Sequence, residues 1–560
     1  MIDIDKPYKA TGTADFVGKP ISTTILCPHF PTFLAIMSKS VRKLSVDSLR
    51  RLETPQTGTV QNAYSSVLPR NRGLATILFM SLSIAAVPYG TGSALINAVY
   101  GGGQLSMFVG LLVVCILDGC IAVALAELAS RYPSSSGVYH WSYCLAKGRK
   151  SIRFLSFITG WIWLIGHWTI TLSVNFGFAS LLAATIAIYH PSFEIAPWQL
   201  VLVFYALCLV TFLICATGDR HLPLIDTLAA ASTLLTCIVV AITLSATAKT
   251  GRHSASYGLG HSETGLSGWG DFSFFIGLLP PAYTLSALGM VTSMSEECVD
   301  AEVQMPKAMV LVPVISGAAS LLFILPICFT LPPLTELLNA PYGQALPYIF
   351  TLVTGSRGGA LGLMFLVLLV TLTCSISITT ATARCTWAMS RDNAIPYSGL
   401  WSKTIWDRPL PALCLVTVLE MLLGLIYLGN TSAFTAFASV GVIALAVAYA
   451  VPIAISIANG RREVLAARWN AGKVAGAATN WMALIWILFE LVLFSMPTAL
   501  PVTETSMNYA SVVFVGCIAI SVVWYAVYGR NRELILLKLL YKHKLTKTDF
   551  QGPVEDISSE

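Results

Sequence analysis

The sequence is poor in charge, since only 11% of its 560 residues are charged whereas 55% are hydrophobic. Ordinary soluble domains carry roughly 25% charged residues, so a series of soluble domains of this total length is excluded. Apolar runs of about 20 residues recur along the chain, and each is long enough to cross a bilayer as a helix. The composition therefore predicts an all-α polytopic membrane protein.

The sequence also lacks the short motifs of several enzyme and binding classes. It contains no Walker-type GxxxxGKS/T segment, and its thirteen cysteines show neither CxxC nor Cys/His metal-ligand spacing. Cysteines within apolar runs, such as Cys115 and Cys374, are expected to be small interior residues rather than disulfide partners. We therefore predict no enzyme activity, no cofactor, no metal site and no nucleic-acid partner.

Hydropathy predicts twelve membrane spans within a membrane domain at 74–529, between a polar N-terminal tail at 1–73 and a C-terminal tail at 530–560. The predicted spans lie near residues 75–99, 104–128, 154–185, 198–217, 222–247, 273–298, 308–330, 359–384, 410–428, 432–458, 481–498 and 508–528.

The distribution of positive charge predicts the orientation of these spans. If the N-terminus is cytoplasmic, only three of the 34 Lys and Arg residues fall in outside segments, namely Lys249, Arg252 and Arg357. Cytoplasmic segments of membrane proteins are enriched in Lys and Arg, so both termini are expected in the cytoplasm. The plasma membrane is the expected location, with the vacuolar membrane or another internal membrane as the alternative.

The first predicted span is interrupted in a way that points to a binding site. Pro88, Gly90 and Gly92 lie in the middle of its apolar run, where a broken helix would leave backbone groups that lipid cannot satisfy. Such groups must face protein or a wet cavity, where a helix N-terminus attracts a carboxylate. A kink stabilised by neighbouring helices is the alternative. The candidate binding residues are Val87, Pro88, Tyr89, Gly90, Thr91, Gly92 and Ser93.

The sixth predicted span is interrupted as well, by Pro280 and Pro281. Interrupted spans in corresponding positions of two halves point to a transport site at a repeat interface. The halves would be inverted repeats at about 75–247 and 273–458, with the spans within 481–528 outside them. Backbone carbonyls and the Ser286 hydroxyl would face an ammonium group, unless the prolines only kink the helix. The candidate residues are Tyr283, Thr284, Leu285, Ser286, Ala287 and Leu288.

Three segments carry a resemblance to a known family. They are AELASRYPSSSGVYHW at 126–141, PPAYTLSAL at 280–288 and RCTWAMSRDNAIPYSGLW at 384–401. In combination the chain resembles the fungal amino-acid/choline/GABA permease branch of the amino acid–polyamine–organocation (APC) transporters. The resemblance implies a twelve-helix fold with two inverted five-helix repeats, alternating access around a substrate held by the unwound parts of spans 1 and 6, and proton symport.

Several polar side chains within the spans are candidates for a coupling or pathway role. Asp118 lies in the second span, and a carboxylate at membrane depth is costly and often functional. Ser375 and Thr379 belong to a hydroxyl stripe on one face of the eighth span, although such residues also pack helices together. A paired structural carboxylate is the alternative for Asp118. Glu420 and Glu490 lie outside the expected core helices and are expected to have structural or oligomer roles.

A group of charged residues is expected at the cytoplasmic ends of the spans. Glu296 and Glu297 end the sixth span, where the helix dipole disfavours negative charge, so basic partners are expected. We hypothesise an inner gate of ion pairs, including Arg72 with Glu296; independent solvated charges are the alternative. The candidate gate residues are Arg72, Glu127, Glu296, Glu297, Arg384 and Arg391.

Together these features predict a permease that imports an amino acid or a related small amine with a coupling proton. A permease for choline or another quaternary amine is the closest alternative, since aromatic side chains in spans 1, 3 and 6 offer cation–π contacts. A nutrient receptor built on a transporter fold is a second alternative, which the long N-terminal tail would permit. A passive channel is a third.

Overall fold

The computed structural model describes residues 70, 72–146, 152–190, 192, 194–218, 221–406, 408–429, 433–503 and 507–529. Apart from residues 70, 72 and 73, the two predicted tails lie outside the described part. Twelve of its helical segments are long and apolar enough to cross a bilayer, which confirms the predicted all-α polytopic fold. Within the described residues, extended pairing is limited to two isolated β-bridges.

Two of the twelve spans are composite. The first consists of α2 (Leu74–Ala85) and α3 (Val87–Ser93). The sixth consists of η3 (Gly270–Phe272), α11 (Ser273–Ile276), α12 (Leu279–Leu285) and η4 (Ser286–Glu297). The remaining spans are α5 (Gln104–Arg131), α7 (Ile152–Ala187), α8 (Pro197–Thr217), α9 (Leu222–Thr247), α13 (Ala301–Thr330), α16 (Arg357–Arg391), α18 (Leu410–Gly424) with η6 (Leu425–Leu428), α19 (Ala433–Ala458), α21 (Val474–Leu493) and α22 (Ala510–Val527).

Short helices connect these spans. They are α4 (Leu95–Tyr100), α6 (Gly137–Leu145), α10 (Ala255–Gly260), α14 (Leu334–Leu337), η5 (Pro341–Gly343), α15 (Ala345–Thr354), α17 (Ser398–Trp401) and α20 (Arg462–Leu465). The connections carry polar residues that hydropathy alone assigns to loops.

The observed span boundaries differ most from the prediction at the seventh, eighth and eleventh spans, and α16, the eighth span, continues to Arg391 rather than ending near residue 384. Helix α13 begins at Ala301 rather than near residue 308, because the helix continues through the polar residues that precede its apolar part. Helix α21 covers Val474–Leu493 rather than 481–498, and Pro497 lies beyond its end. Hydropathy marks the apolar part of a helix, whereas backbone hydrogen bonding sets its ends.

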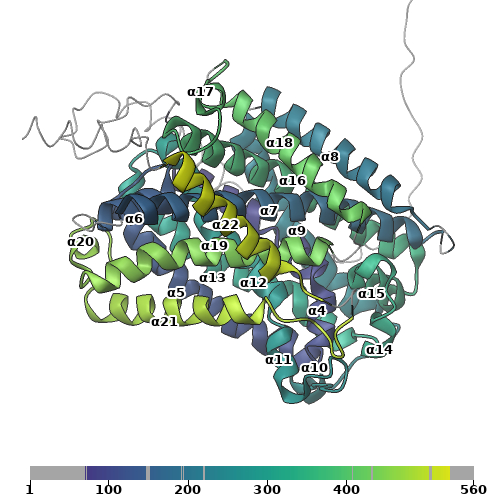
Figure 1. The fold of residues 1–560 in the computed structure, drawn as a ribbon. Coiled ribbons are helices and arrows are strands. Elements are labelled where there is room, and N and C mark those ends of the chain that lie inside the picture. Colours follow the sequence, from purple (N-terminus) through teal and green to yellow (C-terminus); the bar gives the residue numbers. More distant parts are fainter. Residues whose placement is uncertain are drawn as a thin grey trace, which may run out of the picture. The chain divides into compact units, whose positions relative to one another are not determined.

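The interrupted segments lie in the centre of the helix packing. Helix α5 packs against α13, α7 packs against α19 and α16, and α2 packs against α9 and α13, while α3 and α12 contact each other between them. Helix α21 packs against α5 and α19, and α22 packs against α7 and α19 (Figure 1). The eleventh span is therefore in direct contact with the second.

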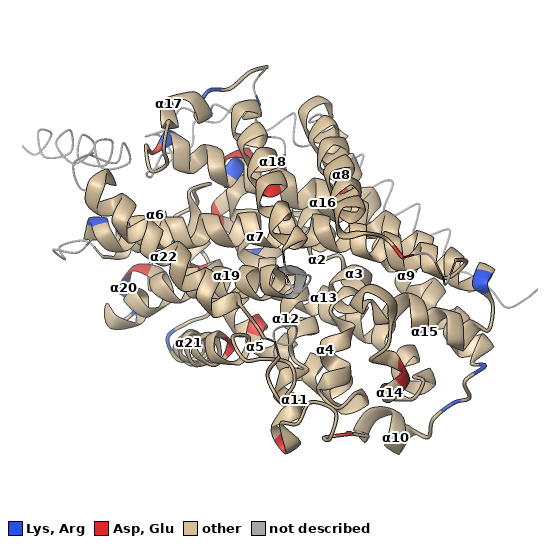
Figure 2. Ribbon diagram, turned by 45° about the vertical axis from the view of Figure 1, so that its right-hand side comes forward, with Lys and Arg blue, Asp and Glu red and all other residues tan. Residues whose placement is uncertain are grey.

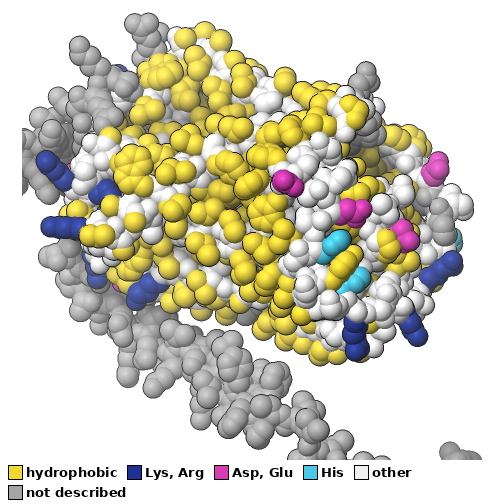
Figure 3. All heavy atoms as spheres, turned by 90° about the horizontal axis from the view of Figure 1, so that it is seen from below, with side chains coloured by type: hydrophobic (Ala, Val, Ile, Leu, Met, Phe, Trp, Pro, Cys, Tyr) yellow, Lys and Arg dark blue, Asp and Glu magenta, His cyan; other side chains and the backbone are white. Residues whose placement is uncertain are grey.

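The outer surface of the helices is apolar. Charged residues of the described part lie mostly towards helix ends and in connections (Figure 2). One face carries a broad hydrophobic band with charged side chains at either end of it (Figure 3). On α9, Leu228, Leu235 and Ile242 recur at helical spacing and are 59%, 54% and 64% exposed. Such a surface matches a lipid environment, because hydrocarbon does not penalise exposed aliphatic side chains.

Candidate functional site

The first span breaks at Ala86. This residue adopts φ 38° and ψ 55° before the chain starts the new helix α3, and left-handed geometry costs a non-glycine residue about 1–2 kcal/mol. Pro88 lies in the first turn of α3, where its missing N–H is tolerated but where it prevents α2 from continuing. The predicted break is confirmed. The candidate residues that follow the break, Val87–Ser93, form one short buried helix.

Helix α3 lies against α12 of the sixth span at close range. A Cβ atom added to Gly90 would lie 2.7 Å from Oγ1 of Thr284 and 3.1 Å from its Cα atom. The hydroxyl oxygens of Thr91 and Thr284 are 3.3 Å apart. The absence of a side chain at Gly90 therefore allows the two interrupted spans to touch, as the sequence predicted for a shared site.

Two tyrosines join this contact to the third span. The rings of Tyr89 and Tyr283 meet edge to face, with centroids 6.4 Å apart. The Tyr283 hydroxyl is 2.9 Å from Oγ of Ser173 on α7, and the Tyr89 hydroxyl donates to the Ser173 carbonyl oxygen at 3.2 Å. Because both rings are at least nine-tenths buried, the α3–α12 contact is closed on this side.

The sixth span changes helix type rather than unwinding. Pro280 and Pro281 lie in the first turn of α12, and the 3₁₀ helix η4 begins at Ser286. The expected free carbonyls and hydroxyl are engaged here, because Ser286 Oγ donates to the Tyr283 carbonyl oxygen at 2.9 Å. Tyr449 of α19 donates to the Ser286 carbonyl oxygen at 3.0 Å and accepts the Gly289 N–H at 3.1 Å. The α12–η4 junction is thus held by a residue of the tenth span.

The hydroxyl candidates on α16 lie in different environments. Ser375 Oγ donates to the Thr371 carbonyl oxygen at 3.1 Å, as in an ordinary helix. The Thr379 hydroxyl is buried and has no hydrogen-bond partner among the described residues. Since buried polar groups are normally satisfied, Thr379 is the better candidate for contact with a bound solute.

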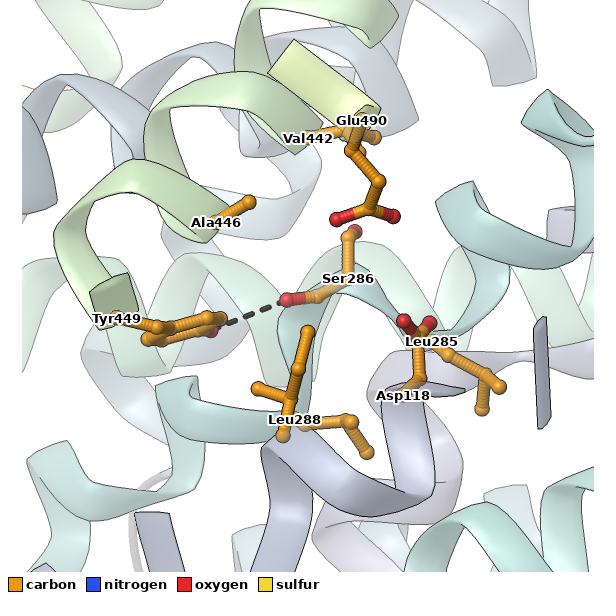
Figure 4. Close-up of a pocket in the computed structure, with 9 residues that line it drawn as sticks. Asp118, Leu285, Ser286, Leu288, Val442, Ala446, Tyr449 and Glu490 are labelled. Atoms are coloured by element: carbon orange, nitrogen blue, oxygen red, sulfur yellow. Dashed lines mark hydrogen bonds between the residues drawn. The ribbon is translucent and has the colours of Figure 1, made fainter. Parts of the chain in front are cut away.

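Asp118 lines a small cavity beside the α12–η4 junction. Leu285, Ser286 and Leu288 line the same cavity, so the structure brings Asp118 to the interrupted part of the sixth span (Figure 4). Asp118 Oδ1 accepts a hydrogen bond from Trp486 Nε1 at 2.8 Å. Glu490 also lines this cavity, so the expectation that it lies apart from the core is wrong. We call it the carboxylate cavity.

Four charged side chains, three from spans and one from a residue before the first span, form a network that we call the ion-pair cluster: Arg72, Asp226, Glu297 and Arg384. Arg72 Nε donates to Glu297 Oε2 at 2.9 Å, and its Nη1 donates to Asp226 Oδ2 at 3.1 Å. Arg384 Nε donates to the other oxygen of Glu297. All four side chains are more than nine-tenths buried, so the cluster ties α9, η4 and α16 to the residue that precedes α2.

The second glutamate of the pair takes a different partner. Arg391 donates to both oxygens of Glu296, each at 2.9 Å, and Ser135 also donates to this carboxylate. The expected Arg72–Glu296 pair is therefore wrong, because Arg72 bonds Glu297 instead. Successive residues of a 3₁₀ helix point about 120° apart, so neighbouring glutamates face different spans.

Glu127 does not belong to this group. Its carboxylate pairs with Arg461 Nη2 at 2.5 Å and accepts the Ala471 N–H at 3.0 Å. Its placement in the gate is therefore wrong. The residue joins α5 to the segment between the tenth and eleventh spans, where it is fully buried.

Nearby, Tyr139 of α6 donates to Asp392 Oδ2 at 2.5 Å. Burial first, and then the Asp392 carboxylate, hold the pKa of Tyr139 well above its usual value. The hydroxyl consequently remains a hydrogen-bond donor, and it connects α6 to the residue that caps α16.

Sequence reasoning missed Asp226 and Tyr449. Asp226 is the single acid within the 222–247 span and follows its start by one turn, so the cost of burying it was the available signal. Tyr449 is one of twenty tyrosines, and nothing in the sequence marks it. Among the described residues, no three His, Cys, Asp or Glu side chains are grouped to hold a metal ion.

Comparisons with known protein sequences bear on the family of this chain. Residues 73–518 match the family model described as amino acid permease. The chain is 28% identical to the choline transporter of Saccharomyces cerevisiae, over 83% of this chain and 82% of that one. It is 27% identical to amino-acid permease BAT1 of Arabidopsis thaliana, over 86% and 96% of the two chains. It is also 27% identical to the polyamine transporter TPO5 of Saccharomyces cerevisiae, over 83% and 77%.

Proposed function

Because the chain belongs to the amino acid permease family of membrane transporters, we propose that it imports an amino acid or a related small amine by proton symport. The observation that carries this proposal is the direct contact of α3 and α12, the interrupted parts of the first and sixth spans. Interrupted helices at the middle of a membrane protein supply the polar backbone groups that a solute needs.

The solute would bind between α3 and α12 after these helices separate. Its carboxylate would meet backbone N–H groups near the Ala86 break. Its ammonium group would meet carbonyls at the α12–η4 junction after they exchange their hydrogen bonds with Ser286 and Tyr449. Thr91, Thr284 and the unpartnered Thr379 hydroxyl would complete the site. In the closed structure the two threonine hydroxyls contact each other, so binding would exchange that contact for contacts with the solute.

The ion-pair cluster would act as the inner gate. It joins α9, η4 and α16 to Arg72, which precedes α2, through buried charges, and breaking it would let the helices move apart on that side. We place this side in the cytoplasm from the positive-inside distribution of Lys and Arg. The plasma membrane is the location that we propose. The two inverted repeats at about 75–247 and 273–458 would move relative to each other around the site.

A quaternary-amine permease is a second candidate. One relative is named as a choline transporter, and the Tyr89 and Tyr283 rings lie together at the α3–α12 contact. Aromatic faces attract quaternary ammonium groups. An amino acid remains the first proposal because the site joins a helix break to hydroxyl and carbonyl groups.

Uptake into proteoliposomes tests the proposal. The panel contains the common amino acids, 4-aminobutyrate, choline and a polyamine, each with and without an inward proton gradient. Accumulation of one amino acid above equilibrium, lost when the gradient collapses, is the expected result. Uptake of choline alone would replace the proposal with the second candidate. Binding without any uptake would favour a receptor.

A further inference from the structure

The carboxylate cavity is assembled from four spans. Asp118 and Ile121 come from α5, Glu490 from α21, Tyr449 from α19, and Ser286 from the start of η4. Figure 4 shows the Glu490 carboxylate pointing towards Ser286, with Asp118 on the cavity's opposite side. Two acidic groups from different helices therefore face one small space next to the α12–η4 junction.

Neither carboxylate has a basic partner in the described structure. Both residues are 3% exposed. Asp118 accepts the Trp486 N–H at 2.8 Å, whereas the carboxylate of Glu490 has no hydrogen bond among the described residues. Glu490 is thus an unpartnered polar side chain, more than nine-tenths buried, that points into the cavity.

The other titratable groups around the pair are a tyrosine hydroxyl and two thiols. The Tyr449 hydroxyl donates to the Ser286 carbonyl oxygen, and the Cys115 and Cys120 thiols of α5 lie near Asp118. No Lys, Arg or His belongs to the described lining. Nothing on α5, η4, α19 or α21 at this cavity balances two negative charges.

Two carboxylates in such surroundings cannot both stay ionised without a cation. Burying each charge costs several kcal/mol, and two like charges that share a site favour the uptake of one proton. The remaining lining is largely aliphatic, through Ile121, Leu285 and Val442, and offers few oxygen atoms to a metal ion. A proton is the cation that this space accommodates with the least rearrangement.

We propose that Asp118 and Glu490 form a shared-proton site through which proton binding controls the α12–η4 junction. This inference rests on the proposed proton symport and identifies where the proton binds. One proton from the outer solution adds to one carboxylate oxygen, so the pair changes from two negative charges to one. Repulsion between α5 and α21 falls, and the cavity walls that include Leu285 and Ser286 draw together. Release of the proton to the inner solution restores both charges.

Tyr449 connects this change to the solute site. Its hydroxyl bonds the Ser286 carbonyl oxygen and the Gly289 N–H on either side of the cavity-lining turn. A movement of the cavity wall is therefore transmitted to the junction that follows α12, and α12 contacts α3. The eleventh span, which lies outside the expected repeats, would thus supply half of the coupling site.

The test uses the full chain in proteoliposomes, with the solute identified by the uptake panel, and compares Glu490→Gln and Asp118→Asn with wild type. Glutamine removes no hydrogen bond at Glu490, and asparagine keeps an oxygen for Trp486. Glu420→Gln is the matched control, because Glu420 is 2% exposed and bonds Asn175 at 2.8 Å rather than another acid. The readouts are gradient-driven accumulation, solute counterflow without a gradient, and proton entry reported by an internal pH dye.

Both cavity variants should lose about tenfold or more of gradient-driven accumulation and the accompanying proton entry. Counterflow should stay within about twofold of wild type, since the solute site is intact, and Glu420→Gln should resemble wild type in all three readouts. Proton entry that persists unchanged in both variants would overturn the inference. So would accumulation driven by a sodium gradient alone. Wild type that performs counterflow but never accumulates solute on a proton gradient would refute the proposed symport itself.

Discussion

Two of the regions that hold buried carboxylates differ in the charge that surrounds them. In the ion-pair cluster, Glu297 contacts the guanidinium groups of both Arg72 and Arg384. In the carboxylate cavity, Asp118 and Glu490 face each other without a basic neighbour. A carboxylate that is balanced by guanidinium groups stabilises one arrangement of helices, whereas an unbalanced pair responds to protons. The first region is suited to a gate and the second to coupling.

The largest expected effect comes from breaking the balanced region. Glu297→Gln leaves Arg72 and Arg384 buried with less compensating charge, and removing one partner of a buried pair costs about 3–5 kcal/mol. We expect a marked fall in the thermal unfolding temperature in detergent. The control is Glu463→Gln, whose pair with Arg131 has side chains 43% and 35% exposed and should contribute about 1 kcal/mol or less. An equal fall in the unfolding temperature of both variants would contradict the expected difference between a buried and an exposed ion pair.

Replacing the unbalanced acid should act in the opposite direction on stability. Glu490→Met removes a buried charge that has no hydrogen bond. The free energy of unfolding should therefore stay the same or rise by up to about 4 kcal/mol, and the unfolding temperature should follow it. Proton-driven accumulation should be lost at the same time. Glu420→Met serves as a comparison, because it leaves the Asn175 amide unpaired and should destabilise by about 1–3 kcal/mol. A strongly destabilised Glu490→Met would show that Glu490 has a structural role instead.

Adding a methyl group at the α3–α12 contact tests the proposed solute site. Gly90→Ala would place a Cβ atom 2.7 Å from Thr284 Oγ1, and overpacking of this kind costs about 1–3 kcal/mol. Solute counterflow should fall sharply. Gly119→Ala on α5 is the matched control, because nothing lies within 4 Å of its added Cβ atom. Counterflow in Gly90→Ala equal to that of the control would argue against a site at the α3–α12 contact.

Double-mutant cycles compare the ion-pair cluster with the neighbouring pair of Arg391 and Glu296. Arg391 and Glu296, whose side chains are 14% and 16% exposed, should show a coupling energy of about 0.5–3 kcal/mol. The Arg72–Glu297 pair should exceed it because both partners are more deeply buried. Arg72 and Glu296 should show almost no coupling, measured by thermal unfolding of the four variants in each cycle. A large Arg72–Glu296 term would refute the pairing described here.

The smallest effect concerns a thiol beside the cluster. Burial raises the pKa of Cys298 to about 12, so little reactive thiolate exists near neutral pH. In a variant with Cys298 as the single cysteine, labelling should be slow and should rise about tenfold per pH unit below that pKa. Adding Glu297→Gln should accelerate the labelling of Cys298 at constant pH, because it weakens the ion-pair cluster. Fast labelling of the unmodified gate would mean that this side is already open.

Features that depend on local composition were accessible from the sequence. The number of spans follows from apolar runs, and the two interruptions follow from Pro88 and from Pro280 with Pro281. The backbone conformation at each interruption could not be predicted. A proline restricts where a helix can continue, but it does not determine which residue takes the non-helical conformation. Ala86, which has no special sequence signature, takes the left-handed conformation.

Pairings between distant segments were much harder to predict. Arg72 and Glu297 are 225 residues apart, and only the three-dimensional packing decides whether Arg72 faces Glu296 or Glu297. The same holds for Glu490, which the sequence places on an added helix and the structure places beside Asp118. Charge and hydropathy indicate which side chains need partners, but they do not identify the partners.

The main chain adds a separate contribution at the gate. Arg72 N–H donates to the Glu297 carbonyl oxygen at 3.0 Å, and the Val299 N–H donates to the Arg72 carbonyl oxygen at 2.8 Å. These two bonds form a short parallel bridge between the entrance to the first span and the exit of the sixth. Opening must break them whatever side chains are present, so part of the opening barrier should be insensitive to ionic strength. High salt would then weaken the ion pairs of the cluster but would leave these two backbone hydrogen bonds in place.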